Sequence, residues 1–333
     1  MKRIFLFTIA VFTFFSLKAQ TAPKLQFKNG VLKIVQFTDT HIELAEKKNL
    51  EVYTTVEKVM EAEKPDLVVL TGDIVTEDNP QDAYRKLASI FEKYKTPWAM
   101  VFGNHDSEHN FPRNDLAVFL QKLPYCINID KAETYGYSNF VLPVLDKDGK
   151  PVAQLYFMDS NMYSTLEPLV AGWGWFTFEQ VGWYREKSRK LTASNNGLPF
   201  PALAFFHIPL PEYTDAWNNK LNPPVGVKNE DECSPEINTG MFAAMLECGD
   251  VMGTFTGHDH INDYIGVLFG IALAYGRVTK TMAEAEDPKA GGRVIVLKEG
   301  KREFDTWIRE GNGNKILECN YPGSFNKVPE KKK

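Results

Sequence analysis

The sequence is poor in cysteine and in clustered positive charge. It has four cysteines, Cys126, Cys233, Cys248 and Cys319. None stands in Cys-x-x-Cys spacing, so a thiolate metal site is not expected, and the sequence does not say whether the four are paired or free. Lys and Arg number 38 against 43 Asp and Glu, and the only basic run is at residues 331–333. This charge balance argues against nucleic acid as a partner.

A hydrophobic run long enough to span a membrane is also missing from the start of the chain. The apolar run over residues 4–17 is shorter than the roughly 20 residues that cross a bilayer. It follows Lys2 and Arg3 and ends before the small-residue boundary at 18–20. This pattern predicts a secretory signal peptide over residues 1–20, with a retained membrane anchor as the alternative. We therefore expect export to a periplasm or out of the cell, with no membrane span after cleavage.

The remaining residues, 21–333, show no linker, repeat or change in composition, which predicts a single domain. Short apolar runs at residues 32–37, 67–70 and 98–102 alternate with two segments of helical periodicity. That alternation predicts parallel strands joined by helices. The second half is richer in β-type runs, with a hairpin at Asp148-Gly149 and a helix capping box at Thr177 and Gln180. We expect a mixed α/β sandwich with helices on the outside.

Histidine is scarce, and its distribution is the most informative feature of the sequence. Five of the six histidines closely follow the end of an apolar strand. The polar residues at these strand ends are Asp39, His41, Asp73, Asn104, His105, His207, His258 and His260. Each motif alone also fits an ordinary turn, but together they predict one site, because strand ends meet at one edge of a sheet. Imidazole, carboxylate and amide ligands without thiolate suit Mn, Fe or Zn, and their number suits two ions.

These motifs resemble those of the calcineurin-like metallophosphoesterases. The matching stretches are DTH at 39–41 with its preceding strand, GD at 72–73, GNHD at 103–106, FFHIPLPEY at 205–213 and GHDH at 257–260. The wider phrases, including YGR at 275–277, resemble the branch grouped with purple acid phosphatases. The resemblance implies a four-layer α/β/β/α sandwich of two mixed sheets flanked by helices, which holds a dinuclear metal centre.

The resemblance also implies a role for each residue. One metal is held by Asp39, His41 and His260, the other by Asn104, His207 and His258, and Asp73 bridges the two. His105 binds no metal and protonates the leaving group, and Asp106 orients His105. We add Arg277 as a candidate contact to the phosphoryl group, because a guanidinium suits phosphate oxygens; a surface arginine is the alternative.

The sequence differs from true purple acid phosphatases at the residues that give those proteins their colour. Those proteins lack a histidine in the first motif and carry an iron-binding tyrosine three residues after the Asp of the Gly-Asp motif. Here the corresponding positions are His41 and Thr76. The iron–phenolate site is therefore absent from this sequence, and neither "purple" nor "acid" carries over.

The sequence predicts a secreted dinuclear-metal phosphoesterase that hydrolyses small phosphate esters by attack of a metal-bridging hydroxide, with phosphomonoesters preferred. The alternatives are a phosphodiesterase on the same site, an enzyme acting on other esters, and a non-catalytic metal-binding protein of the same fold. Two ions of Mn, Fe or Zn are the expected cofactors. The segment 172–176, GWGWF, fits either an aromatic rim of the site or core packing. The natural substrate, the metal pair and the oligomeric state stay open.

Overall fold

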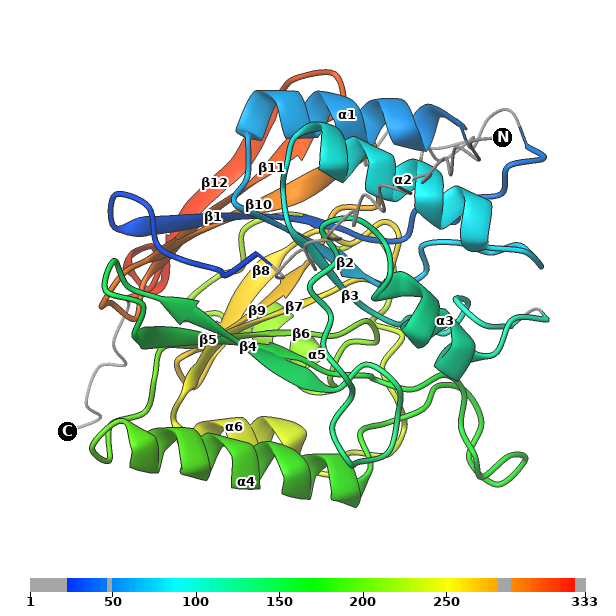
Figure 1. Ribbon diagram of the computed structural model, residues 1–333. Helices are drawn as coiled ribbons and strands as arrows, with labels where there is room; N and C mark the ends of the chain where they lie inside the picture. The colour runs from blue at the N-terminus through cyan, green and yellow to red at the C-terminus, as the bar shows by residue number, and fades with distance from the viewer. Residues whose placement is uncertain (1–22, 47–49, 109, 281–288, 327–333) are drawn as a thin grey trace, which may run out of the picture.

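A computed structural model describes residues 23–46, 50–108, 110–280 and 289–326 of the chain. The signal peptide expected at residues 1–20 lies outside these ranges. Two six-stranded mixed sheets pack face to face, and helices cover their outer faces (Figure 1). The predicted four-layer sandwich is therefore confirmed.

The first sheet combines an antiparallel half and a parallel half. In spatial order its strands are β12 (Lys315–Tyr321), β11 (Phe304–Glu310), β10 (Gly291–Lys298), β1 (Val31–Phe37), β2 (Leu67–Thr71) and β3 (Trp98–Val101). Strands β1, β2 and β3 run parallel, as the alternating pattern predicts, and β10 to β12 are antiparallel. All five residues of β2 are buried, as expected for a strand that is covered on both faces.

The second sheet has a parallel centre and two antiparallel edges. Its order is β4 (Phe140–Leu145), β5 (Pro151–Phe157), β6 (Ala202–Phe205), β7 (Val251–Thr256), β9 (Ile271–Tyr275) and β8 (Ile265–Leu268). The predicted hairpin joins β4 to β5 in antiparallel pairing. Strands β8 and β9 form a tight hairpin, because Phe269 and Gly270 both take positive φ and reverse the chain.

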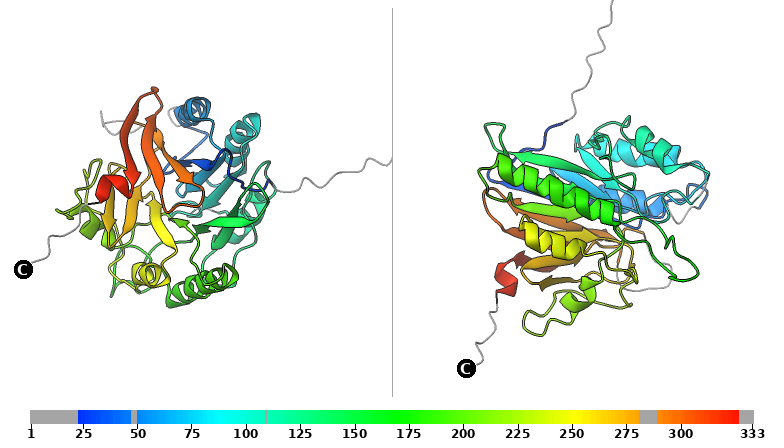
Figure 2. Two further views of the ribbon diagram at one scale, coloured as in Figure 1. Left: turned by 90° about the vertical axis from the view of Figure 1, so that its left-hand side faces the viewer. Right: turned by 90° about the horizontal axis from the view of Figure 1, so that it is seen from below.

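Helices form the two outer layers (Figure 2). Those of the first half are α1 (Glu51–Glu63), α2 (Gln81–Lys93) and α3 (Arg113–Leu120), and those of the second half are α4 (Phe178–Ser194), α5 (Glu212–Trp217) and α6 (Met241–Cys248). A 3₁₀ turn at Gly323–Phe325 follows β12. The capping box of Thr177 and Gln180 is confirmed at the start of α4. At α2 the N-cap is Pro80.

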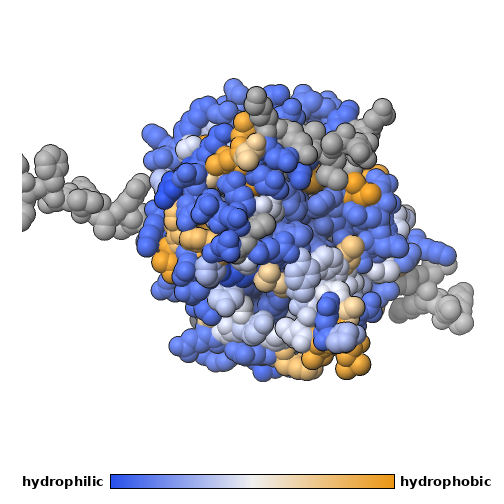
Figure 3. Space-filling view, turned by 90° about the vertical axis from the view of Figure 1, so that its right-hand side faces the viewer, coloured by the Kyte–Doolittle hydropathy of each residue, from blue (hydrophilic) through white to orange (hydrophobic). Residues whose placement is uncertain are grey.

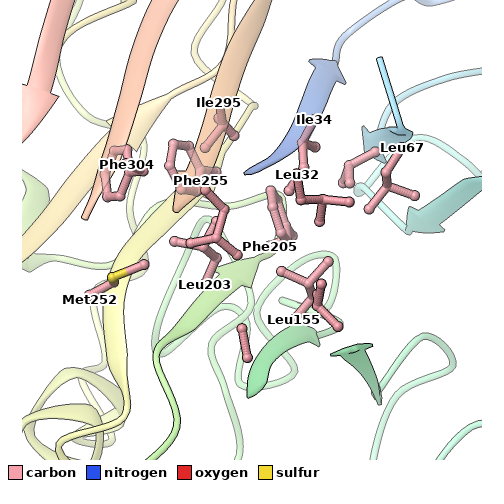
Figure 4. Packing of buried hydrophobic residues seen from close by; sticks show 14 of the residues in the cluster. Leu32, Ile34, Leu67, Leu155, Leu203, Phe205, Met252, Phe255, Ile295 and Phe304 are labelled. Atoms are coloured by element: carbon pink, nitrogen blue, oxygen red, sulfur yellow. The ribbon is translucent and has the colours of Figure 1, made fainter. Parts of the chain in front are cut away.

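The main core lies between the two sheets. Leu32 and Ile34 of β1 face Leu203 and Phe205 of β6 there, and Phe255 of β7 joins them (Figure 4). Two further apolar clusters fill the spaces between each sheet and its helices. Among the described residues, all four cysteines are free, and no helix has the length and hydropathy needed to cross a membrane.

Two buried polar side chains join the sheets near the ends of their central strands. Gln36 on β1 donates from Nε2 to the Thr71 hydroxyl at 2.8 Å and to the Thr256 carbonyl of the other sheet at 2.9 Å. Arg293 on β10 is fully buried, and it donates to the Tyr275 carbonyl of β9 and, at 2.6 Å, to the Asp263 carbonyl. These bonds join the two sheets at the ends of their central strands.

Replacing Arg293 should measure the strength of this link. Arg293→Met leaves the Tyr275 and Asp263 carbonyls buried and unpaired, and each unpaired group costs about 1–3 kcal/mol. We expect the free energy of unfolding, measured by urea denaturation of the metal-free protein, to fall by about 2–5 kcal/mol. Lys301→Met, at an exposed turn position, is the matched control and should change it by less than about 0.5 kcal/mol. Equal effects of the two substitutions would show that Arg293 does not link the sheets.

Candidate metal centre

The seven predicted ligands follow five strands that belong to both sheets. Asp39 and His41 follow β1, Asp73 follows β2, Asn104 follows β3, His207 follows β6, and His258 and His260 follow β7. The structure gathers six of them into two groups, Asp39 with His41 and His260, and Asp73 with His207 and His258. Within each group all ligand atoms lie within 4.8 Å of one another. The seventh, Asn104, adjoins the second group.

In the first group, two imidazoles point their nitrogens at each other. His41 Nε2 lies 3.1 Å from His260 Nε2, and His260 Nε2 lies 3.6 Å from Asp39 Oδ1. Burial outweighs the nearby carboxylates and lowers the pKa of His41 to about 4. His41 is therefore neutral near pH 7 and has a lone pair to offer a cation.

The second group centres on His207. Its Nε2 lies 3.1 Å from both Asp73 Oδ2 and Asn104 Oδ1, and 3.3 Å from His258 Nδ1. Its Nδ1 donates to the Thr71 carbonyl at 2.7 Å, which fixes the ring and directs Nε2 to the centre. Burial lowers the pKa of His258 to about 3, so this imidazole is also neutral at neutral pH.

Asp73 lies between the two groups. Its Oδ2 is 3.1 Å from His207 Nε2 on one side and 3.9 Å from His41 Nε2 on the other. Its Oδ1 accepts the backbone N–H of His105 at 2.8 Å. One carboxylate oxygen is thus oriented by the backbone and the other is shared, which is the position that a bridging ligand requires.

The residues present fit two divalent cations. His41 and His260 turn ring nitrogens toward each other, and a neutral imidazole can offer the lone pair of such a nitrogen to a cation. The set contains nitrogen and oxygen donors and no sulfur, which suits Mn, Fe or Zn. Two buried atoms near the centre, His258 Nε2 and Asn104 Nδ2, have no hydrogen-bond partner among the described residues. The role of each residue as a ligand stays a prediction.

The ligand loops carry unusual backbone conformations. Four ligands have positive φ: Asp39 at 51°, His41 at 41°, Asp73 at 53° and His258 at 78°. A left-handed conformation costs a residue with a side chain on the order of 1–3 kcal/mol. Strain of this kind gathers at functional sites, where the surrounding structure holds it in place.

Two glycines bring the loops after β2 and β3 into contact. A Cβ on Gly72 would lie 2.5 Å from the Gly103 nitrogen, and a Cβ on Gly103 would overlap the Asp73 carboxylate. Glycine is therefore required at both positions, because the two loops touch each other there.

Asp106 does not orient His105, and that prediction is wrong. Its carboxylate turns back into the protein and joins the loops after β2 and β3. Its donors are the Gly103 N–H at 2.7 Å, the Asp73 N–H at 2.9 Å, the Ile74 N–H at 2.8 Å and the Tyr84 hydroxyl at 3.0 Å. The buried amides of two strand ends need an acceptor, and Asp106 is the nearest carboxylate.

Glu108 takes the place that Asp106 was expected to hold. His105 Nδ1 and Glu108 Oε2 form a short hydrogen bond, and the Tyr163 hydroxyl donates to Glu108 Oε1. These two bonds outweigh burial and hold the pKa of Glu108 below its usual range. His105 Nε2 is then left facing the metal centre, 4.0 Å from Asp73 Oδ2. The three-residue spacing from His105 was the available signal for Glu108, whereas Tyr163 has none in the sequence.

Arg277 does not face the metal centre, so the prediction that it contacts a phosphoryl group is also wrong. It is 3% exposed, and its Nη2 lies 2.9 Å from Asp263 Oδ2 and 4.0 Å from Glu310. A buried guanidinium needs a carboxylate partner, and Asp263 supplies it. Asp263 Oδ1 in turn accepts the Val227 N–H at 2.8 Å, so the pair anchors that loop.

The segment 172–176 was expected either at the rim of the site or in the core, and its residues lie in both places. The Trp173 ring contacts the His258 ring edge-on at 4.3 Å between centroids and stacks on Tyr163 at 5.5 Å. Phe176 is buried in the core beneath α4. Part of the segment is therefore a rim of the metal centre and part is core.

Comparison with known proteins gives a consistent result. The sequence model of the family described as calcineurin-like phosphoesterase matches residues 32–262. The chain is 33% identical over 322 residues to a protein of Arabidopsis thaliana named probable inactive purple acid phosphatase 29, covering 85% of this chain and 81% of that one. It is 32% identical over 265 residues to the phosphatase DCR2 of Saccharomyces cerevisiae, covering 71% of this chain and 45% of that one.

Solved structures agree on the fold. A dimetal phosphatase from Danio rerio superposes with a TM-score of 0.58 at 14% sequence identity, over 87% of this chain and 98% of that one. At this level of identity the likeness concerns the arrangement of strands and helices.

Metal affinity should rise with pH because of His207. Burial alone would lower the pKa of His207, but the Asp73 carboxylate beside it raises the pKa to about 9. The protonated ring cannot bind a metal, so below that pH each ion bound at this group must displace a proton. Calorimetric titration with Mn²⁺ should show affinity increasing by up to about tenfold per pH unit between about pH 6 and pH 8, with proton release.

A His207→Asn variant is the control for this measurement. It should bind metal more weakly and with a shallower dependence on pH, because the titrating group is gone. Affinity in the wild type that stays constant over the same range would contradict the assignment.

Proposed function

The chain belongs to the calcineurin-like phosphoesterase family, and on that basis we propose that it is a metal-dependent hydrolase of small phosphate esters. One observation carries the proposal. The complete ligand set surrounds Asp73, and beside it lies an imidazole, His105, that belongs to neither ligand group and is aligned by Glu108. A protein that only stores or senses metal has no need of His105 in this position.

The chain's own residues have distinct parts in the proposed reaction. When bound, two divalent cations lower the pKa of water and stabilise the charge that develops during in-line displacement at phosphorus. The two ligand groups would hold these ions, with the Asp73 carboxylate between the groups. The Thr71 carbonyl and the His105 N–H hold His207 and Asp73 in their orientations.

His105 is placed to protonate the departing alcohol. Its Nδ1 is held by Glu108, so a proton on Nε2 points toward the metal centre. Burial and the Glu108 carboxylate raise the pKa of Tyr163 to about 12, so its hydroxyl keeps its proton and continues to donate to Glu108. The row Tyr163–Glu108–His105 thus holds the proton on Nδ1 and the orientation of the ring, and the acid is the form of the ring that carries a second proton, on Nε2.

We also propose a preference for phosphomonoesters, and the residue that supports it is Lys280 rather than Arg277. Arg277 is paired with Asp263 and adds no charge at the site. Lys280 lies close enough to His41 to lower its pKa, so it does add positive charge near the first ligand group. A monoester carries one more negative charge than a diester and gains more from that lysine.

Export is the remaining part of the proposal. Its support is the charged and then apolar sequence over residues 1–20. A phosphoesterase outside the cytoplasm would act on esters without depleting internal phosphate compounds.

The competing function is a metal-binding protein without catalysis. The name of the Arabidopsis relative, a probable inactive purple acid phosphatase, favours it, whereas the yeast relative is named a phosphatase.

The first test is hydrolysis. Protein loaded with Mn²⁺ should cleave phenyl phosphate, and chelation should abolish the activity because the ligands then hold no ions. Methyl phenyl phosphate, the matched diester, should react with a lower kcat/KM, and Lys280→Met should narrow that difference. Inactivity toward both esters with Mn, Fe and Zn would favour the non-catalytic alternative.

The second test separates acid catalysis from metal binding. His105→Ala should keep both metals but lose about 10²–10⁴-fold in kcat on alkyl phosphates, whose alcohols need a proton to leave. Glu108→Gln should lose about 10-fold on the same substrates through misalignment of the ring. 4-Nitrophenyl phosphate should be much less affected by either variant.

Glu179→Gln, on the exposed first turn of α4, is the matched control for Glu108 and should behave as wild type. Loss of bound metal in His105→Ala, measured by elemental analysis, would show that His105 is a ligand and refute its role as the acid.

A further inference from the structure

A cavity of about 520 Å³ lies behind the loop that follows β3, and two of its lining residues bond to that loop. Its walls are mostly aromatic or apolar, and its floor is polar. The residues used below are Tyr135, Tyr137, Met162, Tyr163, Trp175 and Arg113. We call this cavity the tyrosine pocket. Its volume falls within the range of small-molecule sites and is several times the roughly 150 Å³ that suffices to bind benzene.

The tyrosine pocket shares a wall with the proposed catalytic group. Tyr163 lines the pocket, and its hydroxyl donates to Glu108, which holds His105. Arg113 on the floor donates to the carbonyl of Gly103, the residue before Asn104. The pocket therefore shares a residue with the group that would protonate a departing alcohol.

The floor of the pocket carries no uncompensated charge. Arg113 Nη1 pairs with Asp159 Oδ1 at 3.2 Å, and its Nε donates to Ser107 at 2.7 Å. Asp159 also accepts the Tyr137 N–H at 2.7 Å. Because this buried pair is neutral as a whole, it offers little attraction to a second anionic group, and the pocket selects by shape and by ring contacts.

The rim favours a flat, uncharged ligand. Tyr135 and Tyr137 are 48% and 41% exposed, so their rings are open to contact from solvent. Figure 3 views the side of the molecule where α3 and the loop between β5 and α4 lie; most of this side is hydrophilic, and the pale surface lies mainly in its lower half. Aromatic side chains prefer rings as partners.

We propose that the tyrosine pocket binds the alcohol part of the substrate, and that this part is a neutral planar aromatic group of one or two rings. The phosphate then lies at the metal centre and the ester oxygen lies beside His105. This inference rests on the proposed function, because it assigns the substrate class of the same site. Tyr163 lines the pocket and also donates a hydrogen bond to Glu108.

The kinetic test compares two substrates with similar leaving groups. 2-Phenylethyl phosphate and n-butyl phosphate both release a primary aliphatic alcohol, but only the first carries a ring. We expect kcat/KM to favour the aromatic ester by about tenfold, the value of one or two ring contacts. The double variant Tyr135→Ala/Tyr137→Ala should reduce that preference to less than about threefold.

A second variant shows whether a loss of preference comes from the pocket or from misfolding of the double variant. Thr165→Trp fills the pocket while both tyrosines stay, and it should remove the preference in the same way. Phe269→Ala, at an exposed aromatic residue in the turn between β8 and β9, is the matched control and should keep the wild-type ratio.

A binding test does not depend on turnover. Equilibrium dialysis of metal-free protein against 2-naphthol should show saturable binding that both pocket variants abolish and Phe269→Ala retains. If no ester is hydrolysed but this binding is found, the pocket stands and the proposed function fails. If both esters are hydrolysed equally well, or the pocket variants change neither the ratio nor the binding, the pocket assignment is overturned and the proposed function survives.

Discussion

The negative charge of Asp73, set among three imidazoles, is the interaction around which the molecule is organised. Its Oδ2 lies within 4.0 Å of nitrogens of His41, His105 and His207, which come from loops of both sheets. Bringing one carboxylate to that point requires β2 to end against β3, and both to end beside β6. The glycines at 72 and 103, the left-handed backbone of Asp73 and the amide contacts of Asp106 all serve this placement.

Such a centre is costly for the folded chain, and the rest of the fold offsets the cost. Buried carboxylates and left-handed ligand residues oppose folding. Against them stand a core packed between two sheets and the cross-sheet hydrogen bonds of Gln36 and Arg293. This packing therefore holds the ligand loops in their positions around Asp73.

The sequence predicted those features that follow from strand periodicity and from residue type at strand ends. Asp39, Asp73, His207 and His258 were found because an apolar run stops and a metal-type side chain follows. The errors at Asp106 and Arg277 have a common cause, which is that sequence order does not show where a side chain turns. Asp106 turns toward free amides, and Arg277 finds Asp263 in the interior. Tyr163 reaches Glu108 across a distance in the chain that no local pattern encodes.

The origin of the ligands in both sheets has a consequence for the chain's topology. A cation shared by Asp39 and His260 would close a loop from residue 39 to residue 260, and one shared by Asn104 and His207 would close a second loop inside the first. Closing long loops reduces the entropy of the unfolded chain, as a disulfide does, and the four cysteines of this chain are free. Two ions held in this way would serve as the protein's cross-links: they would tie the first and last thirds of the polypeptide together and make its resistance to unfolding depend on the metal supply around it.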